Sequence, residues 1–413
     1  MADVERAVAD AHRREWAYVL AATVRVSRDV DAAEEAVQDA YVQALRTWAR
    51  DGVPDRPGAW LTTVARRNAL NSARSRRTFE SKLPLLMEAE ETEMPEPADP
   101  DTIPDDRLRL IFTCCHPALA QEAQIALTLR LVCGVATPDI AQAFLVAEAT
   151  MAARLTRAKK KITAARIRYA VPSAAERPER VDAVLTVIHL LYSAGHTAHS
   201  GADLVRDELT ARALDLARML RRLLPDEREA AGLLALLLAH HARRATRTDP
   251  DGRLLRLEEQ DRTAWDRELI AEADRLVVAA LTAGPPGRFT LQAAIAALHA
   301  QAPSYADTDW AQIRVLYDEM LRIWPSPVVA LNRAVAVSMA DGPEPALAEV
   351  ERLERDGRLA GYRYLPATKA DLLHRLGRDA EAVVAYRAAL TLTDNSAEQK
   401  FLIGRVESMQ PGY

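Results

Sequence analysis

The sequence predicts an all-α protein with more than one domain, and three observations support this. Alanine, leucine and arginine are abundant among the 413 residues, whereas aromatic residues make up only 5% and glycine occupies only 15 positions, so helix propensity dominates. Apolar residues recur at spacings of three and four, the period of helices with one buried face. Runs of β-branched residues, which favour strands, are sparse. A chain of this length is expected to contain two or more domains with sizeable cores.

Charge is unevenly distributed along the chain. The formal net charge of −5 gives no indication of a nucleic-acid ligand. However, seven cations and no carboxylate lie between Arg154 and Arg168, and five cations and no carboxylate lie between Arg66 and Arg77. Residues beyond 170 carry more carboxylates than cations. A DNA contact must therefore come from two separate basic patches within the first 170 residues.

Two features bear on location and on metal binding. No uncharged apolar run reaches 18 residues and the N-terminus is too charged for a signal peptide, so we expect a cytoplasmic protein without a membrane partner. The three cysteines argue against a disulfide framework. Cys114, Cys115 and His116 suggest a metal site, but adjacent side chains on a helix point about 100° apart and no second ligand pair has zinc spacing. We expect a buried, reduced segment, and no metal or cofactor.

The first predicted module spans residues 1–80 and consists of several helices. Near residues 30–50 the apolar seam of one helix is expected at Val37, Tyr41, Ala44, Leu45 and Trp48. A polar face on the opposite side is left free for a partner. Its members are Glu34, Glu35, Gln38 and Asp39.

The next helix follows the turn "DGVPDRPG", in which Pro57 suits a helix start. Trp60, Leu61 and Val64 can anchor it. Aromatic, amide and guanidinium groups together suit phosphates and unstacked bases, although an exposed Arg-rich helix without a ligand explains them too. The polar residues of this helix are Arg66, Arg67, Asn68, Asn71, Arg74, Arg76 and Arg77.

Residues 81–106 are acidic, rich in proline and without periodicity, which predicts a linker between two modules. The second module then spans residues 107–170. Thr137 and Pro138 suit the N-cap and first position of its penultimate helix. The stretch "IAQAFLVAEATMAARLTRAKKKI" follows, with a possible turn at residues 145–146.

The last helix of this module has a buried stripe and a basic face. The stripe is predicted at Met151, Leu155, Ala158, Ile162 and Ala165, and the neighbouring face at Arg154, Arg157, Lys161 and Arg168. This is typical of a helix-turn-helix unit whose second helix enters the DNA major groove. A solvated basic helix in an ordinary bundle is the alternative.

Residues 171–413 read as a long series of helices. The stretch "ADLLHRLGRDAEAVVAYRAALTLTDN" places small, bulky and glycine residues as a tetratricopeptide helix pair does, and a weaker copy surrounds Gly342 and Ala346. This predicts a helical solenoid, with an antiparallel bundle as the alternative. The charged stretch "DGRLLRLEEQDRTAWD" is interpreted as a surface turn. The histidines at positions 189, 196, 199, 240 and 241 are interpreted as ordinary residues.

The ordered motifs resemble a known family. "DAAEEAVQDAYVQAL", "PGAWLTTVARRNALNSARSRR", the acidic linker and "ALTLRLVCGVATPDIAQAFLVAEATMAARLTRAKKKI" resemble the extracytoplasmic-function sigma factors of bacterial RNA polymerase. The likeness is to the group with a C-terminal tetratricopeptide-like extension, in which "FTCCHPAL" also resembles the start of the second module. The turn "FLVAEAT" departs from the family because it lacks the glycine often found there.

The resemblance implies partners and residue roles. The partners are core RNA polymerase, promoter double-stranded DNA and the melted non-template strand, and the extension is expected to regulate the sigma modules through an intramolecular contact. The residues implied to bind the polymerase are Glu34, Glu35, Gln38 and Asp39. The residues implied to bind the minus-10 element are Trp60, Arg66, Arg67, Asn68, Asn71, Arg74, Arg76 and Arg77. The residues implied to bind the minus-35 element are Thr150, Met151, Arg154, Arg157, Lys160 and Lys161.

Two other classes of protein compete with this interpretation. A helix-turn-helix regulator with a helical sensor domain explains the second module and the extension, but leaves the first 80 residues and the linker without a role. An enzyme has little support, because the chain contains no glycine-rich phosphate loop and no GxSxG motif. The sequence therefore predicts a non-enzymatic initiation factor.

Overall fold

The computed structural model describes residues 2–80, 106–144, 146–196, 200–201 and 207–409. Within these ranges the regular structure is helical, apart from one pair of two-residue strands and one isolated bridge, so the all-α prediction is confirmed. Residues 81–105, nearly all of the predicted acidic linker, lie outside the described residues. The chain divides into two compact units, unit 1 (Met1–Val187) and unit 2 (Ile188–Tyr413).

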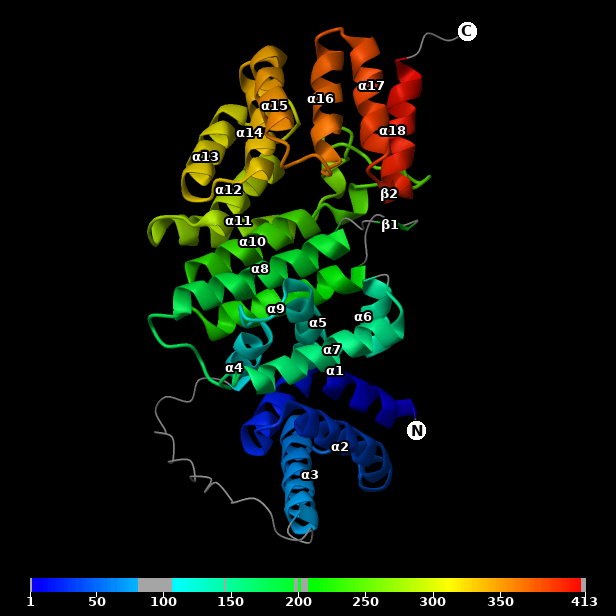
Figure 1. The fold of residues 1–413 in the computed structure, drawn as a ribbon, viewed down its shortest axis with the longest axis vertical. Coiled ribbons are helices and arrows are strands. Elements are labelled where there is room, and N and C mark those ends of the chain that lie inside the picture. Colours follow the sequence, from blue (N-terminus) through cyan, green and yellow to red (C-terminus); the bar gives the residue numbers. More distant parts are fainter. Residues whose placement is uncertain (1, 81–105, 145, 197–199, 202–206, 410–413) are drawn as a thin grey trace. The chain divides into compact units, whose positions relative to one another are not determined.

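Unit 1 begins with three helices that pack on one another (Figure 1): α1 (Ala2–Ser27), α2 (Val30–Asp51) and α3 (Pro57–Glu80). Asp29 caps α2, because its side chain accepts hydrogen bonds from the backbone N–H groups of Asp31 and Ala32. The predicted seam of α2 is buried except for Leu45, which is 41% exposed. Leu45 follows the buried Ala44 and therefore points about 100° away from it.

The remaining elements of unit 1 form the second predicted module and lead into α8. They are α4 (Asp106–Cys114), α5 (Gln121–Leu127), the π-helical turn η1 (Thr128–Val132), α6 (Thr137–Ala143), α7 (Glu148–Ala164) and the first part of α8 (Arg177–His196).

The last two helices of the second module, α6 and α7, pack on each other. The N-cap of α6 is Ala136, so the predicted N-cap at Thr137 is wrong by one residue. Four of the five residues of the predicted stripe of α7 are buried, whereas Ala165 is exposed because the helix ends at Ala164. Of the turn predicted at residues 145–146, residue 145 lies outside the described residues, and Val146 forms a bend between the two helices.

Unit 2 continues α8 and contains the other elements of the chain. They are β1 (Ser200–Gly201), α9 (Asp207–Leu223), α10 (Arg228–His241), η2 (Arg244–Thr246), η3 (Arg262–Ala264), α11 (Arg267–Thr282), α12 (Arg288–Gln301), α13 (Trp310–Ile323), α14 (Pro327–Ala340), α15 (Pro343–Asp356), α16 (Tyr364–Arg375), α17 (Asp379–Leu390), β2 (Asp394–Asn395) and α18 (Ser396–Ser408).

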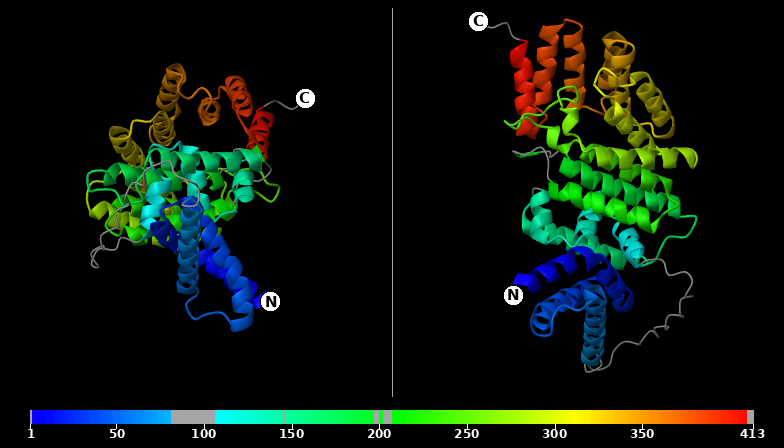
Figure 2. Two further views of the ribbon diagram at one scale, coloured as in Figure 1. Left: turned by 60° about the horizontal axis from the view of Figure 1, so that its bottom comes forward. Right: turned by 180° about the vertical axis from the view of Figure 1, so that it is seen from behind.

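From α13 onward, each helix of unit 2 packs mainly on its neighbours in the chain, the arrangement of a helical solenoid, whereas α12 packs mainly on α10. Figures 1 and 2 show α13–α15 as one group and α16–α18 as another. The repeat positions predicted near the end of the chain are confirmed, because Ala382 and Tyr386 are buried and Gly377 has a positive φ of 73° in the turn between α16 and α17. The parallel pairing of β1 with β2 brings residues 200–201 next to residues 394–395.

Candidate nucleic-acid interface

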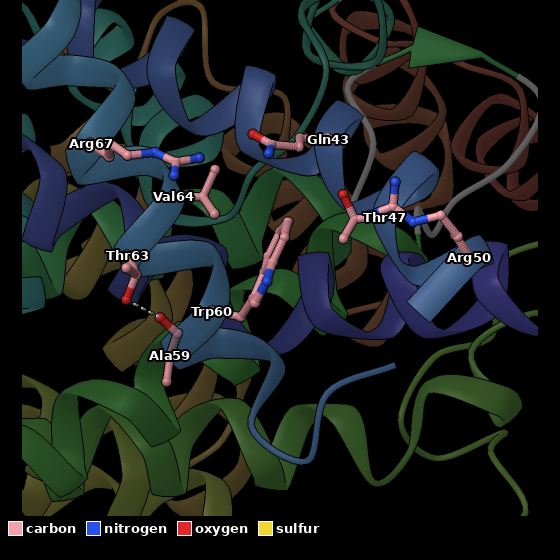
Figure 3. A pocket seen from close by; sticks show the side chains of 8 residues that line it. All are labelled: Gln43, Thr47, Arg50, Ala59, Trp60, Thr63, Val64 and Arg67. Carbon is pink, nitrogen blue, oxygen red and sulfur yellow. Dashed lines mark hydrogen bonds between the residues drawn. The ribbon is translucent and has the colours of Figure 1, made fainter. Parts of the chain in front are cut away.

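A cavity of about 550 Å³ lies between α2 and α3. Figure 3 shows Trp60 at its centre, with Arg67 and Arg50 on opposite sides of the indole ring. The indole is held against the buried Trp48, with ring centroids 5.6 Å apart in an edge-to-face arrangement. An aromatic ring in an open cavity with guanidinium groups at its edges can stack an unpaired base and neutralise phosphates next to it.

Five residues of this cavity were missed by the sequence analysis, namely Ala59 and Thr63 of α3 and three residues of α2. Gln43, Thr47 and Arg50 line it from α2, opposite Trp60 and Arg67 from α3. They recur at spacings of four and three, so they share one face of α2. That spacing could have identified the three residues as one face of a helix. The sequence did not show that α3 packs against this face of α2 and places Trp60 opposite it.

The predicted minus-10 residues separate into exposed and supporting groups. Arg67 and Asn71 are exposed, and so is Arg74. Arg66 and Asn68 are partly buried, and Arg66 donates a hydrogen bond to the carbonyl of Ala22 at 3.3 Å, which ties α3 to α1. Arg76 and Arg77 belong to α3, but their side chains lie outside the described residues.

The predicted recognition helix α7 presents an exposed basic surface. Thr150, Arg157, Lys160 and Lys161 are exposed along it. Arg154 is instead paired with Glu122 of α5 at 2.9 Å, and its guanidinium lies 5.9 Å from the centre of the Phe144 ring. Met151 is fully buried, so its side chain supports the helix and is not placed to contact a base.

One residue of the predicted polymerase face departs from expectation. Glu35, Gln38 and Asp39 are exposed, but Glu34 is only 6% exposed, so the expectation that it lies free on the surface is wrong. Glu34 pairs with Arg130 of η1 at 2.5 Å and with Lys159 of α7 at 2.7 Å. Both cations come from the second module, more than 90 residues along the chain.

The lysine of this cluster is tied to two carboxylates, because Lys159 also pairs with Asp31 at 2.7 Å. Burial lowers the pKa of Lys159, but its hydrogen bonds to Asp31 and Glu34 outweigh that effect and raise the pKa above its ordinary value. The lysine is therefore fully charged in the ion-pair cluster, which is defined as Asp31, Glu34, Arg130 and Lys159.

Hydrogen bonds and close packing join the same two modules elsewhere. Trp16 of α1 donates from its indole nitrogen to the carbonyl of Leu131 at 3.0 Å, and Tyr169 donates to the carbonyl of Ala21 at 2.9 Å. Gly134 has a φ of 68°, and a Cβ there would lie 2.9 Å from the Trp16 ring. The two modules of unit 1 thus form one packed body.

The cysteine segment is structural within the described residues. Cys114 and Cys115 are buried, as predicted, and burial raises the pKa of both thiols, that of Cys115 to about 12. Among the described residues, no group of three or more His, Cys, Asp or Glu side chains could hold a metal ion. None of the described helices has the length and apolar character needed to cross a membrane.

Comparison with known proteins agrees with this arrangement. Residues 8–79 match the family model described as Sigma-70 region 2, residues 109–162 match Sigma-70, region 4, and residues 180–281 match a Family of unknown function (DUF6596). An uncharacterized protein of Rhizobium meliloti (strain 1021) is 44% identical over 388 residues, which cover 93% of this chain and 91% of the relative. No solved structure matches the chain.

The region 2 match covers α2, α3 and the cavity between them, and the region 4 match contains α6 and nearly all of α7. Both regions occur in the order that the motifs predict, and a long helical part follows them. The chain therefore belongs to the sigma-70 family, as a sigma factor of the extracytoplasmic-function type with a C-terminal extension.

Proposed function

We propose that this sigma factor binds core RNA polymerase through the exposed face of α2 and contacts a two-element promoter through two surfaces. The cavity between α2 and α3 would receive an unstacked base of the minus-10 element, with the phosphates around it neutralised by Arg50 and Arg67. The exposed cations of α7 would enter the major groove at the minus-35 element. The observation that carries this proposal is the cavity, because Trp60 lies inside it and two guanidinium groups flank it.

The packing of the two modules of unit 1 against each other limits how they could contact both promoter elements. Elements named minus 10 and minus 35 are about 25 base pairs apart, which is about 85 Å along straight duplex DNA. The two modules that would contact them are instead joined by the ion-pair cluster and by the hydrogen bond from Trp16 to Leu131. Promoter recognition at both elements therefore requires the modules to separate. We interpret the packed form as a resting state.

The test of the proposed function is transcription with core polymerase and a candidate two-element promoter. The full chain is expected to yield specific transcripts, and Trp60→Ala is expected to reduce them because stacking contributes about 1 to 3 kcal/mol per base. Trp60→Phe keeps an aromatic face and should retain most of the activity. DNA binding without any association with polymerase would favour the alternative, a helix-turn-helix regulator.

We also propose that the C-terminal extension regulates the sigma modules. Its solenoid helices offer surfaces for binding protein segments, and the sequence provides no recognisable catalytic set there. Arg180 of α8 donates to the carbonyl of Phe112 at 2.5 Å, so a cut at residue 170 would remove a contact within unit 1. A chain ending at His196 keeps all of α8 and is the better comparison.

The expected result is a clear difference in transcription between the full chain and the chain ending at His196, measured at matched concentration. Circular dichroism should first establish that the shortened chain keeps the helix content of its own residues. Equal transcription and equal polymerase affinity of the two chains would contradict regulation by the extension.

A further inference from the structure

Unit 2 contains a cluster of arginine and histidine side chains that the proposed function does not use. From the sequence, the stretch of residues 251–266 is expected to form a surface turn, and His196 and His240 are expected to be ordinary residues. The structure brings them together. The oxyanion cluster consists of Tyr192, His196, His240, Arg243, Gln260, Arg262 and His299.

The side chains of the cluster are linked by direct contacts. Tyr192 stacks on His196 with ring centroids 5.3 Å apart, and His196 lies 5.3 Å from the ring of His240. Arg243 hydrogen-bonds to Nδ1 of His240 at 3.2 Å and to Oε1 of Gln260 at 3.5 Å. Residues from α10 and from the stretch before η3 therefore meet at the Arg243 guanidinium, and α8 adds a ring that packs next to His240.

Arg262 forms the other side of the cluster. It donates to the carbonyls of His299 and Ala302, each at 2.7 Å, and lies 4.7 Å from the centre of the Trp265 ring. The residue is only 8% exposed, and its Nη2 is buried without a hydrogen-bond partner among the described residues. The two neutral carbonyl oxygens thus accept only some of the hydrogen bonds that this buried guanidinium can donate.

No acidic side chain among the described residues forms a direct ion pair with the cluster, although Asp307 acts on Arg262 from a greater distance. Neither Arg243 nor Arg262 has an ion-pair partner among the described residues, and a guanidinium stays charged at any pH that a protein experiences. Burial lowers the pKa of both guanidinium groups, and it lowers the pKa of His196 and His240, so both imidazoles are neutral. Removing an unpaired cation from water costs several kcal/mol. Binding of an anion next to such a group would therefore stabilise it.

Unpartnered donors within the cluster indicate the chemistry of that anion. Tyr192 is only 2% exposed, and its hydroxyl has no hydrogen-bond partner among the described residues, although Arg247 and Arg243 lie within electrostatic range. Within the part of the chain that the structure describes, the Nδ1 atoms of His196 and His299 are also buried without hydrogen-bond partners. Hydroxyl, guanidinium and imidazole groups can all donate hydrogen bonds, and a ligand that accepts from several of them at once is an oxyanion.

We propose that the oxyanion cluster of unit 2 binds a small molecule through its phosphate or carboxylate group. A ligand would approach from the side of Arg243, His240 and His299, which are partly exposed, whereas Tyr192, Gln260 and Arg262 are buried. The oxyanion would lie between Arg243 and the Tyr192 hydroxyl. This binding site is independent of polymerase and of DNA.

The test measures thermal unfolding of the full chain in inorganic phosphate, sulfate or acetate, each against sodium chloride at the same ionic strength. A ligand that binds only the folded state raises the melting temperature with its concentration. We expect such a rise with at least one of the three anions. Phosphate and sulfate test the tetrahedral group, and acetate tests the planar carboxylate.

Variants make the test specific to this cluster. Arg243→Met is expected to weaken anion binding by about ten- to a hundredfold, because charged hydrogen bonds are lost. Without anion it should melt at or above the temperature of the unaltered protein, since a partly buried charge without an ion-pair partner has been removed. Tyr192→Phe should weaken anion binding with little effect on the fold. Arg275→Met removes an exposed arginine of α11 and serves as the matched control.

Two outcomes would overturn the proposal. One is the absence of any rise in melting temperature with all three anions beyond the effect of sodium chloride. The other is an equal rise in the unaltered protein and in Arg243→Met. The measurement needs neither polymerase nor promoter, so its failure is distinguishable from a failure of the proposed sigma function.

Discussion

Replacing both Arg130 and Lys159 with Gln is expected to separate the two modules of unit 1 and to increase the affinity for core polymerase. The substitutions leave Glu34 buried between the modules without a cation, since its partners at 2.5 and 2.7 Å are gone. An uncompensated buried charge costs about 3 to 5 kcal/mol, and separation returns it to water. The equilibrium should therefore move toward the separated form by a factor of about 100 or more.

Two measurements check this result. Small-angle X-ray scattering should show a larger radius of gyration for the double variant, and titration with core polymerase should show tighter binding. Lys160→Gln with Lys161→Gln is the matched control, because it removes the same charge from exposed positions of the same region. Adding Glu34→Gln to the double variant should restore part of the packed form, since a neutral amide is cheaper to bury. An unchanged radius in the double variant would refute the idea that the ion-pair cluster holds the modules together.

Replacing the exposed cations of α7 is expected to weaken promoter binding in two distinguishable ways. Arg157 lies on the exposed face of the helix, and Arg157→Ala should cost about 1 to 3 kcal/mol at one base position if it contacts a base edge. Lys160→Ala and Lys161→Ala should weaken binding to all sequences and lower the salt slope by about 1 each, as expected for phosphate contacts. The combined variant should lose most promoter affinity.

Binding of the sigma–polymerase complex to matched and mismatched minus-35 duplexes, at several salt concentrations, separates these effects. Arg154→Ala should behave differently from Arg157→Ala. Its pairing with Glu122 and its contact with Phe144 make it a positioning residue for α7 in this arrangement. Arg275→Ala, an exposed arginine of unit 2, controls for the loss of positive charge. Promoter use unchanged by the combined variant would remove α7 from the recognition role.

The sequence by itself determined the features that depend on local periodicity. Val37, Tyr41, Ala44 and Trp48 are buried along α2, and Met151, Leu155, Ala158 and Ile162 along α7, as their spacing predicts. Side chains three and four positions apart lie on one face of a helix whatever surrounds it. For the same reason the all-α class and the basic surface of α7 followed from the sequence. The turn glycines Gly342 and Gly377 also followed from it, because positive φ favours glycine.

Only the tertiary structure decided which of these faces meet. Glu34 has the local pattern of an exposed residue, yet it is buried because Arg130 and Lys159 approach it from the second module. Gln43 and Thr47 became cavity residues because α3 places Trp60 opposite them. Arg243 and Arg262, separated in the chain from Tyr192, form one cluster because helices α8, α10 and α12 bring them together. A pattern within one helix fixes which side chains share a face, whereas the partner of that face depends on contacts between residues distant in the chain.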